Sequence, residues 1–189
     1  MPQPTPFTAL LFGLNGCLVD AARANGRLKG PAQALPGALP MLDALHEQGV
    51  PCAWVEELPE AACRHLASPL PDWLGAHNNG HKQARWPAPD SCWQALMALK
   101  VSRLEGCVLV SNEPRLLQAG LNAGLWTVGL ASCPTLRQAQ LSSETRELKR
   151  ARTTLQLFNL GVHSVIDQLT ELDACLHDIG LRRAKGEKP

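Results

Sequence analysis

The stretch FTALLFGLNGCLVD, residues 7–20, decides the fold. Its first half is a short apolar run, and Gly13 and Asn15 follow directly. A compact apolar run that ends in glycine and asparagine is typical of a buried β-strand that opens into a loop. We therefore predict a strand over 7–12 and a loop from Gly13 onward, with the polar segment 21–35 continuing as loop.

The rest of the chain alternates between apolar runs and amphipathic segments. Further strands are predicted over 50–55, 107–110, 125–130 and 162–166. Helices are predicted over 36–48, 56–67, 90–100, 114–123, 142–160 and 167–180. Residues 69–90 are rich in proline and are predicted to be irregular apart from one short strand. This alternation predicts an α/β fold with a mostly parallel sheet covered on both faces. One domain over 1–181 is expected, followed by a flexible basic tail over 182–189.

Composition excludes several classes of function. The formal net charge is +1 and there is no tyrosine, so neither a nucleic acid nor a membrane surface is an expected partner. The N-terminal residues lack the pattern of a signal peptide, which makes a cytoplasmic location the expectation. Seven cysteines are scattered without a CxxC pair, which favours reduced thiols over a zinc site.

Ligands of such folds bind beyond the carboxyl ends of the strands. The candidate site residues are those that follow the strands: 13–17, 56–57, 82–86 and 111–113. His77 and His81 are interpreted as exposed loop residues, because the Asn-Asn-Gly between them favours a turn over a metal-binding helix.

Several of these positions resemble motifs of the haloacid dehalogenase (HAD) superfamily. FGLNGCLVD (12–20) resembles its first motif, F-D-x-D-G-T-L-x-D, and RWPAPD (85–90) resembles its K/R-P-x-P-D segment. VSNE (110–113) stands where the superfamily has an acidic V-G-D-T. The runs GLNAGLWTVG (120–129) and GVHSVID (161–167) are similar to runs of the phosphonatases within it. The resemblance implies a Rossmann-like three-layer sandwich.

In active relatives, an aspartate of the first motif is the nucleophile that becomes phosphorylated, and Mg²⁺ neutralises the surrounding charge. Gly13 stands at that position here, so no covalent intermediate can form there. Asn15 stands at the second acidic position and cannot hold a proton for transfer at neutral pH. Cys17 replaces the threonine that contacts phosphate.

The remaining motifs are altered in the same direction. Glu56 stands where a hydroxyl donates to phosphate, and its charge would repel that group. Trp86 stands where a lysine or arginine is expected, with Arg85 and Lys82 out of register. Asn112 replaces the aspartate that binds Mg²⁺. No catalytic residue and no cofactor is therefore expected, and Asp20, Asn112 and Glu113 are weak residual candidates for a metal.

Phosphonatases also carry a helical cap domain, inserted after the first motif, that supplies a Schiff-base lysine. Segment 21–35 is too short for such a domain, and Lys29 within it is interpreted as an exposed loop residue. We therefore expect a capless protein without the part that specifies the substrate.

Two hypotheses remain open from the sequence. The first is an inactive, phosphonatase-like pseudoenzyme that acts by binding a protein or small molecule, or by forming a homodimer that covers the open site. The alternative is a hydrolase with altered, Mg²⁺-independent chemistry, using Glu56, Glu57 or Glu113 as a base or Cys17 as a nucleophile.

Overall fold

The computed structural model describes residues 7–21, 23–24, 27–28, 30–78, 84–132 and 141–189. Within them, the largest sheet has six strands in the order β10-β9-β8-β1-β6-β7, and every neighbouring pair is parallel. These strands are β1 (Ala9–Gly13), β6 (Cys52–Glu56), β7 (Gly75–Asn78), β8 (Cys107–Ser111), β9 (Trp126–Leu130) and β10 (Ser164–Ile166). The predicted α/β fold with a mostly parallel sheet is confirmed.

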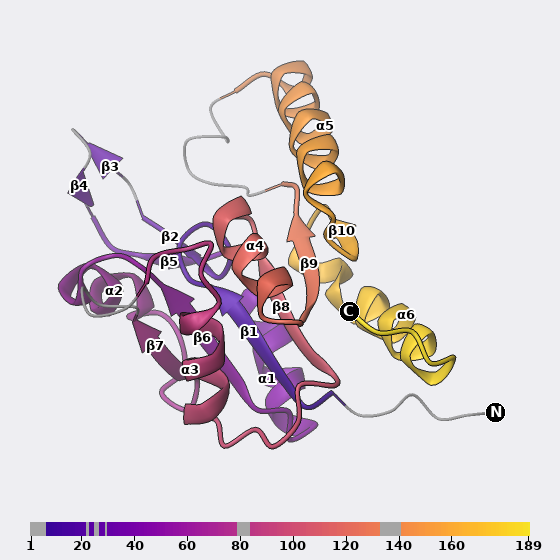
Figure 1. The fold of residues 1–189 in the computed structure, drawn as a ribbon. Helices are drawn as coiled ribbons and strands as arrows, with labels where there is room; N and C mark the ends of the chain where they lie inside the picture. The colour runs from indigo at the N-terminus through magenta and orange to yellow at the C-terminus, as the bar shows by residue number, and fades with distance from the viewer. Residues whose placement is uncertain (1–6, 22, 25–26, 29, 79–83, 133–140) are drawn as a thin grey trace.

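Helices cover both faces of this sheet, so the protein has three layers (Figure 1). They are α1 (Ala38–Glu47), α2 (Glu60–Ala67), α3 (Asp90–Ala98), α4 (Pro114–Asn122), α5 (Ser143–Leu160) and α6 (Leu172–Ala184), with a 3-10 turn over Leu169–Glu171. Side chains alternate along each strand, so Leu10 and Phe12 of β1 pack on the side of α1, α2 and α6. Ala9 and Leu11 pack on the opposite side with α3 and α4.

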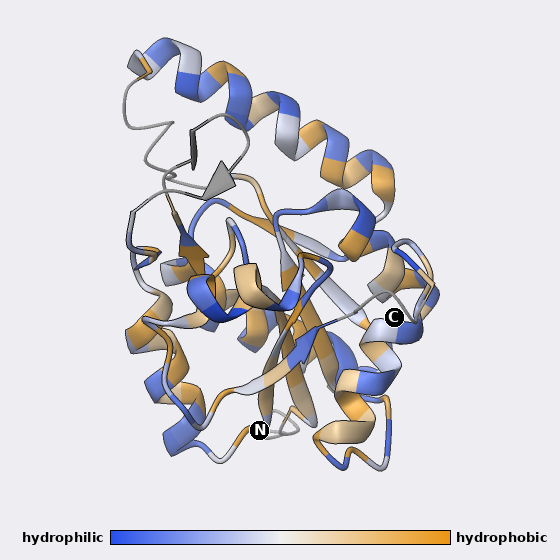
Figure 2. Ribbon diagram, turned by 90° about the vertical axis from the view of Figure 1, so that its left-hand side faces the viewer, coloured by the Kyte–Doolittle hydropathy of each residue, from blue (hydrophilic) through white to orange (hydrophobic). Residues whose placement is uncertain are grey.

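The hydropathy of the ribbon follows the same layering: apolar residues gather on the central strands and polar residues on the outer helices (Figure 2). Helix α5 departs from this pattern. Among its residues Leu157 is the buried one, while Leu148, Leu155 and Phe158 are more than half exposed. No described helix combines the length and the apolar character needed to cross a membrane.

The segment predicted as a plain loop after β1 contains short antiparallel pairs. Strand β2 (Val19–Asp20) pairs with β5 (Gln33–Ala34), and β3 (Arg23–Ala24) pairs with β4 (Arg27–Leu28). Two-residue strands are set by local backbone hydrogen bonds and leave no periodic signal in the sequence. Within the described residues, no separate domain stands between β1 and α1.

The end of the chain also differs from its prediction. The last helix does not stop at Gly180 but continues through residues 182–184, which were assigned to the tail. Arg182 lies 4.8 Å from the centre of the Trp126 ring and donates to the carbonyl of His163, and Arg183 lies 5.3 Å from the Phe7 ring. These contacts extend the helix, because a basic side chain can cover apolar surface with its stem while its charge lies over an aromatic face.

Candidate functional site

The carboxyl ends of β1, β6 and β8 meet at one edge of the sheet. Gly13 is in register with Val55, and Phe12 with Val110. The last residues of the three strands, Gly13, Glu56 and Ser111, therefore lie together at the edge where such folds bind ligands. The structure thus brings together positions that are far apart in the sequence.

The space beside Gly13 is filled by Ser111. A Cβ atom at position 13 would lie 2.7 Å from the Ser111 hydroxyl oxygen, closer than real contacts allow. Ser111 is fully buried, and its hydroxyl accepts a hydrogen bond of 3.0 Å from the backbone N–H of Glu113. The V-G-D-T motif has glycine where this chain has Ser111. The side chain has therefore moved from one side of the contact to the other.

The carboxylate of Glu56 turns toward backbone donors at this edge. It accepts hydrogen bonds from the N–H groups of Asn15 (3.2 Å) and Glu57 (2.9 Å), and from that of Leu58. Burial raises the pKa of Glu56, and the nearby charge of Glu113 adds to the rise, while the three N–H donors oppose it. Glu56 thus lies at the site as predicted, but as a hydrogen-bonded buried group.

Trp86 does not supply the positive charge that its motif position would require. Its ring is buried in the second core cluster, and its indole N–H donates to Ser91 over 3.0 Å. Its backbone N–H donates to Glu57, and its carbonyl accepts from Arg115. Arg85 beside it is exposed.

The cation that reaches this edge is Arg115, which the sequence analysis missed. It lies in the first turn of α4, and its guanidinium is 3.8 Å from the Glu57 carboxylate. Its position shortly after 111–113 was a usable signal, because the residues that open the helix after a strand also face the ligand edge.

Two amides complete the edge, and both leave an acceptor without a partner. Asn112 packs against the turn at Gly16, where a Cβ would lie 2.6 Å from its Nδ2 atom. The side-chain oxygens of Asn15 and Asn112 are buried and make no hydrogen bond. Because most buried polar atoms are paired, these two oxygens mark the edge as polar but incompletely satisfied.

The residues present do not fit Mg²⁺, which binds through one or two carboxylates. Gly13, Asn15 and Asn112 offer none, and Glu56 is held by backbone donors. Asp20 lies in β2 opposite Gln33, and Glu113 caps α4 by accepting from the N–H of Arg115. In the part of the chain that the structure describes, no group of three His, Cys, Asp or Glu side chains could hold a metal ion.

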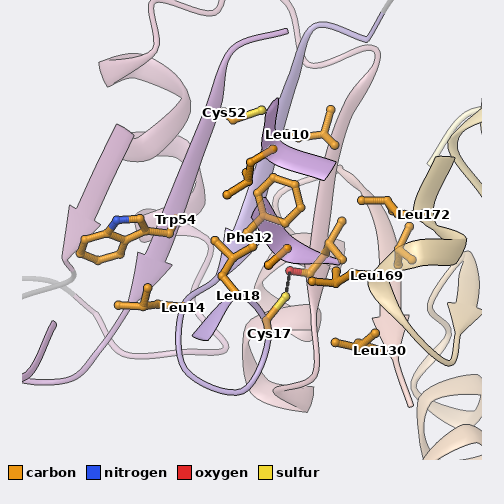
Figure 3. Close-up of a cluster of buried hydrophobic side chains, with 14 of the residues drawn as sticks. Leu10, Phe12, Leu14, Cys17, Leu18, Cys52, Trp54, Leu130, Leu169 and Leu172 are labelled. Atoms are coloured by element: carbon orange, nitrogen blue, oxygen red, sulfur yellow. Dashed lines mark hydrogen bonds between the residues drawn. The ribbon is translucent and has the colours of Figure 1, made fainter. Parts of the chain in front are cut away.

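Cys17 is a core residue. It is fully buried with Phe12, Leu14 and Leu18, and its thiol donates to the carbonyl of Val110 over 3.5 Å (Figure 3). The thiol therefore points into the protein and away from the edge where a substrate would arrive.

The two runs that carried the phosphonatase resemblance meet at the opposite end of the sheet. The backbone N–H of Thr127 donates to Nδ1 of His163 over 3.0 Å, and the Trp126 and His163 rings lie 4.9 Å apart. Burial and the charge of Arg182 lower the pKa of His163. An unprotonated Nδ1 at the amino ends of β9 and β10 indicates a structural role.

Some predicted residues fall elsewhere. His77 was expected in an exposed loop, but it lies in β7, opposite Val55, and is half-buried. The reason is that edge strand β7 continues through His77 before the Asn-Asn-Gly turn signal takes effect. Lys29, His81 and Lys82 lie outside the described residues.

Comparisons with known proteins agree with this architecture. No protein-family model matches the chain. Phosphonoacetaldehyde hydrolase from Aeromonas hydrophila is 30% identical over 177 residues, covering 84% of this chain and 61% of the hydrolase. The enzyme of the same name from Salmonella typhimurium is 28% identical over 172 residues, covering 82% of this chain and 62% of its own length. The chain thus spans about three fifths of the curated relatives it matches.

Solved structures extend the likeness. One crystal structure is 56% identical, has a TM-score of 0.87, and is matched over 97% of this chain and 100% of its own. A phosphonoacetaldehyde hydrolase-like protein from Oleispira antarctica is 28% identical with a TM-score of 0.73, over 83% of this chain and 60% of its own. A HAD family hydrolase from Deinococcus radiodurans with bound phosphate and sodium shares the fold at 22% identity and a TM-score of 0.64, over 93% and 97% of the two chains.

Proposed function

This chain belongs to the HAD superfamily as a phosphonatase-like member, and we propose that it has lost phosphoryl-transfer activity and acts by binding. The observation that carries the proposal is the contact at Gly13, where the Ser111 hydroxyl fills the space that a nucleophilic side chain would need. A missing nucleophile could be a tolerated local change. A filled space indicates that the neighbouring residue has adapted to the loss.

Electrostatics supports the same proposal. Glu56 places a buried carboxyl group among the backbone donors that would otherwise be free for an anion. Two like charges 4 Å apart repel by about 4 kcal/mol at the effective dielectric of a partly buried site. A repulsion of that size would weaken phosphate binding roughly a thousandfold. Arg115 offsets it incompletely, because its guanidinium faces Glu57 and the Trp86 carbonyl.

The test is turnover of phosphonoacetaldehyde and of a general aryl phosphate by the purified chain with Mg²⁺. We expect no turnover above that of a parallel preparation of the Asn112→Ala variant, which controls for contaminating phosphatases. Mg²⁺-dependent turnover that disappears in the Asn112→Ala preparation would refute the loss of activity.

One observation favours the alternative of a Mg²⁺-independent hydrolase. A buried carboxyl with a raised pKa, such as Glu56, is suited to act as a general base. In that case activity would show a pH profile that the Glu56→Gln substitution abolishes. The thiol version of this alternative requires that Cys17 be accessible, and it fails if a thiol reagent leaves native Cys17 unmodified.

A homodimer also remains a proposal, and helix α5 favours it. Leu148, Leu155 and Phe158 form an apolar face of α5 that is separate from the face buried through Leu157. Paired apolar faces of this spacing are typical of helix–helix contacts. We expect Leu155→Glu to lower the sedimentation coefficient to that of a monomer, while Gln156→Glu on the same helix leaves it unchanged. Equal sedimentation of all three proteins as monomers would exclude the dimer.

A further inference from the structure

We infer that the backbone N–H groups of Asn15, Glu57 and Leu58 form an oxyanion-binding cradle that the protein fills with its own Glu56 carboxylate. The cradle would take an inorganic oxyanion such as phosphate once that carboxylate is removed. This inference rests on the proposed loss of activity and deepens it, because it names the group that blocks the ancestral ligand.

The geometry of the cradle comes from two loops that the parallel sheet places side by side. Asn15 lies in the loop after β1, whereas Glu57 and Leu58 directly follow β6. The Glu56 Oε2 atom is 3.2 Å from the Asn15 nitrogen, and Oε1 is 2.9 Å from the Glu57 nitrogen. Both carboxylate oxygens are therefore engaged, one by each loop. Successive backbone N–H groups that converge on one point are a known form of anion site.

Carboxylate and cradle need each other. Glu56 is 8% exposed, and a carboxylate buried to that degree is strongly unfavourable unless it is paired or hydrogen-bonded. The N–H groups have the converse need, since a buried backbone donor without an acceptor is also costly. An alanine at position 56 would leave the donors without an acceptor, and a dissolved oxyanion can restore one.

Nearby charges favour an internal occupant over an external one. The carboxylates of Glu57 and Glu113 lie at the same edge, and the Glu113 charge acts on Glu56. Arg115 contacts Glu57 rather than Glu56. An oxyanion entering beside an ionised Glu56 would meet several carboxylates, whereas one that replaces Glu56 leaves the number of negative groups unchanged.

The experiment measures binding of inorganic phosphate by titration calorimetry and by ³¹P line broadening, at constant ionic strength set with chloride. Four proteins are compared: the wild type, Glu56→Ala, Glu56→Gln and the control Glu60→Gln. Glu60 is an exposed glutamate four residues further along, so its substitution changes net charge equally without opening the cradle.

Glu56→Ala is expected to bind phosphate at least about tenfold more tightly than the wild type, which corresponds to about 1.4 kcal/mol. Glu56→Gln, which removes the charge but keeps the volume, should give a smaller gain, and Glu60→Gln none. If Glu56→Ala does not fold, any gain for Glu56→Gln over Glu60→Gln carries the same conclusion.

The inference is wrong if both Glu56 variants bind phosphate within about twofold of Glu60→Gln, or if the wild type binds it as tightly as they do. These outcomes leave the proposed loss of activity standing. Turnover by the wild type would instead overturn the proposed function, so the two failures are distinguishable.

Discussion

Substitution of Gly13 by alanine tests whether Ser111 occupies the place of the lost side chain. The new Cβ would lie 2.7 Å from the Ser111 Oγ atom. That oxygen can withdraw only by giving up the N–H of Glu113, which it accepts over 3.0 Å. The glycine backbone itself raises no objection, because its φ lies outside the left-handed region. We expect Gly13→Ala to lower the free energy of unfolding by about 1–3 kcal/mol, the usual cost of an overpacked core.

The same substitution should cost little in a Ser111→Gly background, where the obstructing hydroxyl is absent. Loss of the hydrogen bond to Glu113 occurs with and without the alanine, so it cancels in a double-mutant cycle. The remaining coupling energy is expected to be about 1–3 kcal/mol. It can be measured by urea unfolding of the four proteins, followed by tryptophan fluorescence, since the chain has five tryptophans.

Gly75→Ala provides the matched control. Gly75 is also a strand glycine outside the left-handed region, and its Cβ would lie 3.0 Å from that of Ala53. Strand β7 is three strands from β8, or about 14 Å at the usual strand spacing. Gly75→Ala and Ser111→Gly should therefore be additive within about 0.5 kcal/mol. Equal additivity for Gly13→Ala and Ser111→Gly would refute the idea that the two positions share one space.

Three further predictions concern titratable groups. Because burial raises the pKa of Glu56, its stabilising contribution is present at low pH and is lost as the pH rises through that pKa. The unfolding free energy of the wild type relative to Glu56→Gln should therefore fall with rising pH, and a flat difference would contradict this. The pKa of His163 is lowered, so its contribution is present above the ordinary histidine pKa and is lost as the pH falls through the lowered one. His163→Gln should remove that part of the acid sensitivity, and an unchanged profile would argue against it. Burial raises the pKa of Cys52, Cys63 and Cys92 to about 12. These thiols should stay unmodified by a disulfide reagent at pH 8 until urea unfolds the chain, whereas rapid labelling that mass spectrometry assigns to one of them would refute their burial.

Much of the fold could be predicted because it depends on local pattern. The apolar run before Gly13 and the strand-helix alternation were enough to give a parallel sheet with helices on both faces. The short pairs between 19 and 34 and the continuation of α6 past Gly180 were not predicted. Both depend on contacts that a hydropathy pattern does not encode, such as the position of Arg182 over Trp126.

The sequence by itself determined which chemistry is missing, because a glycine at position 13 and an asparagine at 112 exclude a carboxylate whatever the fold does around them. Only the tertiary structure decided what fills the space. Ser111 faces Gly13, Glu56 turns to the backbone of Asn15, and Arg115 reaches Glu57. The physical reason is that parallel pairing joins strand ends that are distant in the chain, and the directions of side chains beyond those ends follow from packing and backbone hydrogen bonds rather than from sequence spacing.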